Sequence, residues 1–318
     1  MDTFDGDDVP MRKAGADCTD GQISRRSLIR GMAAAPLLLV ADGSRAGTAL
    51  RRPLSTRIIQ SGHSLTDPIV PALDTMVAHI GGADARRRVI DRSTIPGSPM
   101  DWRWDHRVQY MPDARHEIDR YELLVITERV SLSGTMPWHN SEAMAFRWFT
   151  HARENGNQGA GAESILYATW VDITSGPDFE NPYNDPEGHL RFRDRLPLEM
   201  ARWQGILDHV NTERPASAPA MQMIPGPLIM AAAYDAIAAA EAPGLARIAD
   251  LFSDAIHINP AGTYLITLAH LAVIYGYDPR ALPAGVAQAM RLQPETARWM
   301  ETLVHDVLRA YPGAGYAG

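Results

Sequence analysis

The sequence predicts an α/β fold, a three-layer α/β/α sandwich with a central parallel sheet. Short apolar segments alternate with helix-like segments from residue 57 to residue 274, which is the pattern of successive βαβ units. The clearest strand, residues 121–127, is nearly continuous in apolar character, as expected for a parallel strand covered on both faces. With 318 residues, 45% of them hydrophobic and 21% charged, the chain can bury a sizeable core.

The predicted elements follow one another in chain order. Arg57 to Gln60 is the first short strand, and Asp67 with Pro68 opens a helix to about Ile80, because proline suits the first helical turn. The further strands are predicted at 89–90, 121–127, 164–170 and 221–225, and the further helices at 141–153, 198–210, 227–240 and 264–274. Residues 171–197, rich in Pro, Gly, Asn and Asp, form either a long loop near the site or a surface insertion.

Residues 1–49 are predicted to be a leader that is removed, which leaves residues 50–318 as a single domain. The leader carries the arginine pair Arg25-Arg26, then an apolar stretch from Met32 to Val40, then small residues at 47–49 for cleavage. This order resembles a twin-arginine signal peptide and predicts export to the periplasm or the medium. The apolar stretch is shorter than the roughly 20 residues that span a bilayer, so no membrane span is expected. The alternative is a disordered tail with an accidental arginine pair.

Charge and cysteine content exclude several functions. A net charge of −8 argues against a nucleic-acid partner, because phosphate binding relies on clustered Lys and Arg. The only cysteine, Cys18, lies in the predicted leader, so the mature chain has neither a disulfide nor a cysteine nucleophile. Four scattered histidines lack the spacing of a zinc helix and predict surface positions rather than a metal site: His106, His116, His139 and His151.

Two short segments near opposite ends of the predicted domain can carry chemistry. Ser64 stands where the chain leaves a strand and enters a helix, Gly62 permits the tight turn, and the helix amides can help to stabilise an oxyanion. Asp254 and His257 form an Asp-x-x-His segment before Asn259-Pro260, a helix cap and first turn. A serine needs a neighbouring base, and a histidine serves best when a carboxylate fixes its tautomer, so these segments predict a nucleophile, a base and an orienting acid.

These segments resemble those of the SGNH (GDSL-type) hydrolases. The Gly-Asp-Ser-Leu-like turn of that family is matched by residues 62–65, and its Asp-x-x-His block before a helix is matched by residues 254–257. The resemblance implies a flavodoxin-like sheet, Ser64 as nucleophile, His257 as base, Asp254 as its orienter, and no metal or organic cofactor.

The resemblance also implies an oxyanion hole, of which one part departs from the family pattern. The amides of Ser64 and Gly97 match two donors by position. Where Gly-x-Asn-Asp is expected after the third strand, this chain has residues 127–130, Thr-Glu-Arg-Val. Asn140 either supplies the third donor from a longer loop or caps the following helix. Glu128 and Arg129 form either an ion pair beside the site or the end of the strand.

The substrate is less closely defined. Trp102, Trp104 and Trp138 lie in segments expected near the strand ends, where they either stack on sugar faces or complete a core. Export, these rings and the family's habit of cleaving small acyl groups favour a carbohydrate acetyl ester, with lipid and aryl esters left open. One alternative is a glycan-binding or assembly protein with weakened chemistry, and another is an acyltransferase.

Overall fold

The computed structural model describes residues 50–318, all of which belong to one compact unit. The predicted leader, with Arg25, Arg26 and Cys18, lies outside the described residues. A five-stranded, all-parallel sheet has the order β2-β1-β3-β4-β5 and is flanked by helices, which confirms the predicted α/β class. Its strands are β1 (Arg57–Gly62), β2 (Val89–Thr94), β3 (Leu123–Ile126), β4 (Glu163–Ala168) and β5 (Gln222–Pro225).

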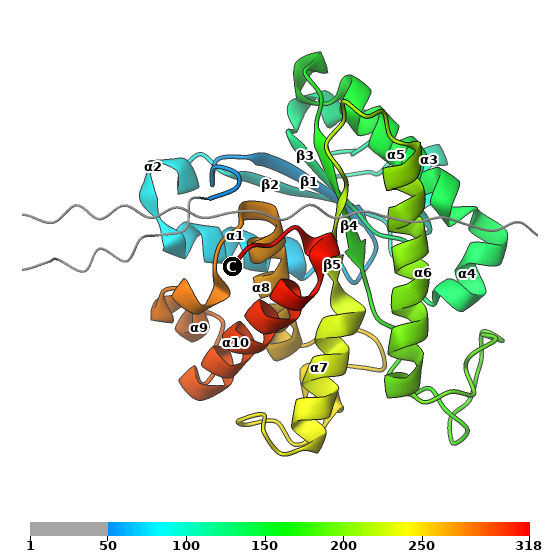
Figure 1. Ribbon diagram of the computed structural model, residues 1–318, viewed down its shortest axis with the longest axis vertical. Helices are drawn as coiled ribbons and strands as arrows, with labels where there is room; N and C mark the ends of the chain where they lie inside the picture. Colours follow the sequence, from blue (N-terminus) through cyan, green and yellow to red (C-terminus); the bar gives the residue numbers. More distant parts are fainter. Residues whose placement is uncertain (1–49) are drawn as a thin grey trace, which may run out of the picture. The chain divides into compact units, whose positions relative to one another are not determined.

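Strand residues alternate between two apolar cores, as parallel strands covered on both faces do. Leu123 and Val125 face a core with helices α1 (Ile69–Ile80), α7 (Gly226–Ala238), α8 (Pro260–Tyr275) and α10 (Pro294–Ala310). Leu124 and Ile126 face the second core, against α5 (Ser141–Asn155) and α6 (Phe192–Glu213). Figure 1 shows α5 and α6 on one side of the strands and α1, α8 and α10 on the other.

The helix predicted at 198–210 is longer than expected, because α6 begins at Phe192 and runs through Pro197 to Glu213. The prediction placed Pro197 before the first turn, where proline is common. Instead, the earlier turns bury Phe192 and Leu196 in the first apolar core, and this burial holds the helix together despite the missing amide of Pro197. The preceding irregular segment therefore covers residues 169–191 rather than 171–197.

Several elements were not predicted. They are helices α2 (Gly82–Ala85), α3 (Met100–Asp105), α4 (Leu132–His139), α9 (Ala284–Ala289) and α10, and the 3₁₀ turns 118–120, 157–159, 248–251, 279–281 and 312–314. Of these, α3 and α4 matter for the site because both follow strand ends. Within residues 50–318, no helix combines the length and apolar character needed to cross a membrane.

Candidate active site

Ser64 lies in a tight turn between β1 and α1. The amide of Thr66 donates to the carbonyl oxygen of His63 at 2.8 Å, and the amide of Ile69 continues the turn to Thr66 at 3.1 Å. A Cβ atom on Gly62 would lie only 2.0 Å from Thr66 Oγ1. The glycine is therefore required by this close approach and not by a left-handed backbone.

Asp254 holds His257 in place from a loop near the other end of the described chain. Its Oδ1 accepts hydrogen bonds from the amides of Ile256 and His257 at 2.9 and 2.7 Å, and its Oδ2 accepts from His257 Nδ1 at 2.8 Å. Burial raises the pKa of Asp254, but these hydrogen bonds outweigh it and leave the pKa below its usual value. The group is thus an ionised acceptor that fixes the proton of the imidazole on Nδ1.

The turn and the loop meet because α1 packs against α8. With Nδ1 protonated, His257 Nε2 accepts the hydroxyl proton of Ser64, and Nε2 lies 2.8 Å from Oγ across 193 residues of sequence. Ser64 is half-buried, whereas the Asp254 side chain is exposed. All three predicted catalytic side chains are therefore joined in one hydrogen-bonded chain, with the arrangement that activates a serine.

This chain opens into a cavity of about 560 Å³, a volume suited to a small ligand. Gly97, in the turn after β2, lines it in a left-handed conformation with φ of 66°. The wall also includes residues from the end of β3, α4, the 169–191 segment and the first turn of α6: Arg129, Ser131, Trp138, His139, Asp172, Glu180, Tyr183, Asp185 and Arg195.

A buried arginine, which was not predicted from the sequence, ties three strand ends together. Arg103 of α3 donates from Nε to Ser61 Oγ at 3.2 Å, from Nη1 to the Ser98 carbonyl and from Nη2 to the Thr127 carbonyl. These partners follow or end β1, β2 and β3. The side chain is 2% exposed, so its fork holds the three strand ends in a fixed arrangement.

Glu128 is a second buried ionisable group that joins the turns at the strand ends. Its Oε1 accepts from the amides of Met100 and Arg129 at 2.9 and 2.7 Å, and burial raises its pKa. Its carbonyl oxygen lies 3.0 Å from His63 Nε2. The expected alternatives for Glu128 and Arg129 were a side-chain ion pair or a strand end. In the described residues the contact is between the carboxylate and the Arg129 amide, after β3 has ended.

His63 completes this link as a neutral ring. Burial, and then the Arg103 guanidinium, lower the pKa of His63 to about 3. Its Nδ1 accepts from the amide of Leu65 at 3.4 Å, so the proton is on Nε2 and is donated to Glu128. The residue before Ser64 is thus bonded to the residue before Arg129.

The remaining predicted residues do not all reach the cavity. Asn140 is exposed between α4 and α5 with φ of 46°, makes no side-chain cap and is not part of the wall, so neither of its expected roles is seen. Trp102 stacks on His106 with ring centroids 3.6 Å apart, away from the wall, and Trp104 is buried. Trp138 lines the cavity and is 82% exposed.

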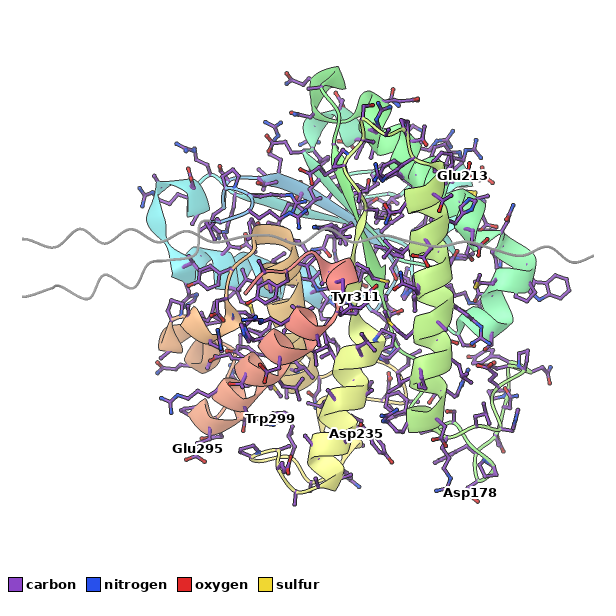
Figure 2. All side chains as sticks on the ribbon, in the orientation of Figure 1. Asp178, Glu213, Asp235, Glu295, Trp299 and Tyr311 are labelled. Carbon is purple, nitrogen blue, oxygen red and sulfur yellow. The ribbon has the colours of Figure 1, made fainter. Side chains whose placement is uncertain are left out.

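The 169–191 segment borders the cavity, which supports the first of its two expected roles. Asp185 accepts from Ser131 and Ser133 Oγ and pairs with buried Arg195, and this fastens the segment to α4 and α6. Tyr183, 84% exposed, lines the cavity beside Trp138's helix and was missed because a lone tyrosine in a polar segment carries no signal. Figure 2 shows Asp178 at the amino end of α6, opposite Glu213.

No metal cluster is formed by His, Cys, Asp or Glu side chains within residues 50–318. No protein-family model matches the chain, and comparisons with curated proteins and with solved structures find no significant match.

Proposed function

We propose that this protein is an exported serine esterase with the three-layer α/β/α sandwich of the SGNH hydrolases. The observation that carries the proposal is the continuous chain of 2.8 Å contacts from Ser64 Oγ through His257 to Asp254. The strand order 2-1-3-4-5 is also that of flavodoxin-like folds, whose sites lie beyond the carboxyl ends of the strands.

The reaction follows from the positions of the protons. Ser64 Oγ attacks the acyl carbon, its proton passes to His257 Nε2, and the carbonyl electron pair moves to oxygen. The C–O bond to the alcohol then breaks, and His257 returns the proton to the leaving oxygen. Water repeats the sequence on the acyl-enzyme. Among residues 50–318, no hydrogen bond occupies the amides of Ser64 and Gly97, which leaves both free to donate to the oxyanion.

The substrate proposed is a small acyl ester, of acetyl type, on a carbohydrate. Two exposed rings at the cavity, those of Trp138 and Tyr183, support a sugar because aromatic faces pack against its C–H groups. Carboxylates and amides beside them, at Asp172, Glu180 and Asn181, can bond hydroxyl groups.

The test is turnover of p-nitrophenyl acetate and of an acetylated oligosaccharide by wild type, Ser64→Ala and the control Ser217→Ala. Ser217 is an exposed serine whose hydroxyl, among residues 50–318, accepts a hydrogen bond from Arg153 and is not part of the cavity wall, so its loss is expected to leave turnover unchanged. We expect Ser64→Ala to lower kcat by roughly 10⁴-fold or more. Equal rates for wild type and Ser64→Ala on every ester would refute the esterase proposal.

A glycan-binding or assembly protein on the same fold is the second candidate, and the position of Asn140 outside the cavity wall favours it. Loss of one oxyanion donor costs roughly 3 kcal/mol of transition-state stabilisation. Glycan binding without Ser64-dependent turnover would support this candidate. Acyl transfer, with a sugar hydroxyl in place of water, would instead yield acylated acceptor in the same assay.

Export is proposed on residues 1–49 alone, because the arginine pair and the short apolar stretch are typical of such leaders. Replacement of both Arg25 and Arg26 by lysine is expected to retain the precursor in the cytoplasm. Cell fractionation measures where the protein accumulates. Unchanged export of that variant would contradict the twin-arginine interpretation.

A further inference from the structure

We propose that Arg129 is a catalytic residue whose guanidinium binds the oxyanion formed when Ser64 attacks the ester. This inference rests on the proposed esterase function and names the side-chain donor that Asn140 does not supply. It is carried by the position of Arg129 in the sheet, by the bonds that fix its backbone, and by the lack of another partner for its charge.

The register of the sheet places Arg129 beside the nucleophile. Ser61 of β1 pairs with Ile126 of β3, and the Thr127 amide donates to the Ser61 carbonyl at 3.3 Å. Three residues beyond this pair, the two chains reach Ser64 and Arg129 respectively. Both residues line the same cavity, as does Gly97 from the turn after β2, on the other side of β1.

Hydrogen bonds fix the backbone next to each of the two side chains. His63, which precedes Ser64, donates to the carbonyl oxygen of Glu128, which precedes Arg129, at 3.0 Å. The buried Glu128 carboxylate also accepts from the Arg129 amide at 2.7 Å. The positions from which the nucleophile and the guanidinium project are therefore fixed relative to each other before substrate binds, which is what electrostatic preorganisation requires.

The charge of Arg129 has no counter-ion among residues 50–318. Its side chain is exposed, and no described side chain or carbonyl accepts from it. The other arginine of the cavity wall and two of its histidines are engaged: Arg195 pairs with Asp185, His139 with Asp101, and His257 with Asp254. Arg129 is thus the cation of the wall that is left to meet charge brought by a substrate.

The chemistry identifies the charge that Arg129 meets. When the Oγ–C bond forms, the carbonyl pair becomes a full negative charge on oxygen, within reach of donors beside Ser64. A guanidinium N–H donates to an anion more strongly than a neutral amide does. Since this charge exists only after attack, its stabilisation raises kcat and leaves ground-state binding nearly unchanged.

The closing experiment compares wild type with Arg129→Met, Arg129→Lys and the control Arg298→Met. Arg298 is an exposed arginine on α10, a helix that contributes no residue to the cavity wall. Values of kcat and KM are measured on neutral p-nitrophenyl acetate and on anionic mono-p-nitrophenyl succinate, and inhibition by phenylboronic acid is measured alongside. Thermal unfolding checks that each variant is folded. Because the Arg129 side chain is exposed, we expect its replacement to leave the fold intact.

For Arg129→Met we expect kcat to fall roughly 100- to 1,000-fold on both esters, with KM changed less than about threefold. Inhibition by phenylboronic acid, which forms a tetrahedral anion on a serine, is expected to weaken at least about tenfold. Arg129→Lys keeps the charge without the fork, and we expect an intermediate kcat. The control is expected to match wild type.

Three outcomes would overturn the assignment. Ser64-dependent turnover of the neutral ester that survives Arg129→Met would remove Arg129 from the oxyanion site while leaving the esterase intact. A loss confined to KM for the succinate ester would make Arg129 a binder of substrate carboxylate. Absence of Ser64-dependent turnover in wild type would refute both the esterase proposal and the role of Arg129.

Discussion

Asp254 divides its two oxygens between structure and chemistry. Oδ1 accepts from two backbone amides and so shapes the loop, while Oδ2 accepts from the ring of His257. One carboxylate therefore sets both the position of the imidazole and its tautomer. This division allows the two roles to be separated by a single isosteric change.

In Asp254→Asn we expect the loop to persist and turnover to collapse. The amide oxygen can keep both backbone bonds, but its NH₂ group then faces His257 Nδ1 and moves the ring proton to Nε2, where it blocks removal of the Ser64 proton. A loss of roughly 10⁴-fold in kcat with little change in the unfolding temperature is expected. Kinetics and calorimetry measure it, with Asp235→Asn, in a surface pair with Arg193, as control. Wild-type turnover in Asp254→Asn would contradict the orienting role.

At the scale of residues, local spacing predicted more than distant packing did. Asp254 and His257 contact each other across three positions, so the sequence alone indicated a pair. Arg103 was missed, and the burial of Glu128 was not predicted, because charged residues are almost never fully buried and the partners of these two come from separate strand ends. The contact of Ser64 with His257 was predicted from the residue types of the two segments and from their resemblance to a known family, and the two side chains lie 2.8 Å apart.

At the scale of elements, Asn259 connects α8 to the loop that holds His257. Its Oδ1 accepts from the amides of Ala261 and Gly262 at the helix start. Its Nδ2 donates back to the carbonyls of Asp250 and Phe252. The side chain therefore caps the helix and clamps the loop at once.

Asn259→Ala is expected to lower the free energy of unfolding by about 1–2 kcal/mol, which is within the range observed when an N-cap side chain is replaced by alanine. The alanine variant also removes the Nδ2 bonds that hold the loop with His257, so we expect its kcat to fall. Asn259→Ser keeps an acceptor for the helix but has no amide donor for the loop. We therefore expect the serine variant to regain most of the stability but little of the kcat that the alanine variant loses. Urea unfolding and esterase kinetics on the same samples measure the two effects. Full recovery of kcat in the serine variant would show that the loop does not depend on Nδ2.

Elements with a strong apolar signal were predicted, and those defined by tertiary contacts were not. The five strands and the buried helix α8 were recognised from their apolar runs, although β2 extends to Thr94 and β3 ends at Ile126. The start of α6 was placed too late because Pro197 was assigned to the end of the preceding irregular segment. Helix α4 contains Pro137 and weak apolar periodicity, so only its packing reveals it.

At the scale of the whole molecule, the buried side chains of His63 and His270 are neutral in the folded protein. Burial lowers the pKa of His270 to about 4, and that of His63 to about 3. The unfolded chain binds a proton on each near pH 6.5, so between pH 6.5 and the folded values it holds more protons than the native state. Their contribution to stability is complete above pH 6.5 and is lost as the pH falls.

His270→Leu is expected to flatten the acid side of the stability curve. Each buried histidine lowers the free energy of unfolding by about 1.4 kcal/mol for every unit that the pH falls between roughly pH 6.5 and its folded pKa. The variant lacks the contribution of His270 to this slope. Burial raises the pKa of Glu128 and of Glu199, which acts in the opposite direction, but equally in both proteins. Urea unfolding at pH 7.5, 6.0 and 5.0 gives the slopes. Identical slopes would mean that His270 does not titrate as described.

The contact between Ser64 and His257 joins residues that are 193 positions apart in the sequence, and this separation affects folding. Contacts of such long sequence separation are slow to close, because loop entropy is lost before the contact stabilises anything. Ser64 is made early in synthesis, and His257 only after four of the five strands have followed it. Recovery of turnover during refolding is thus a late reporter, which registers the docking of α8 on α1 rather than the first formation of helix.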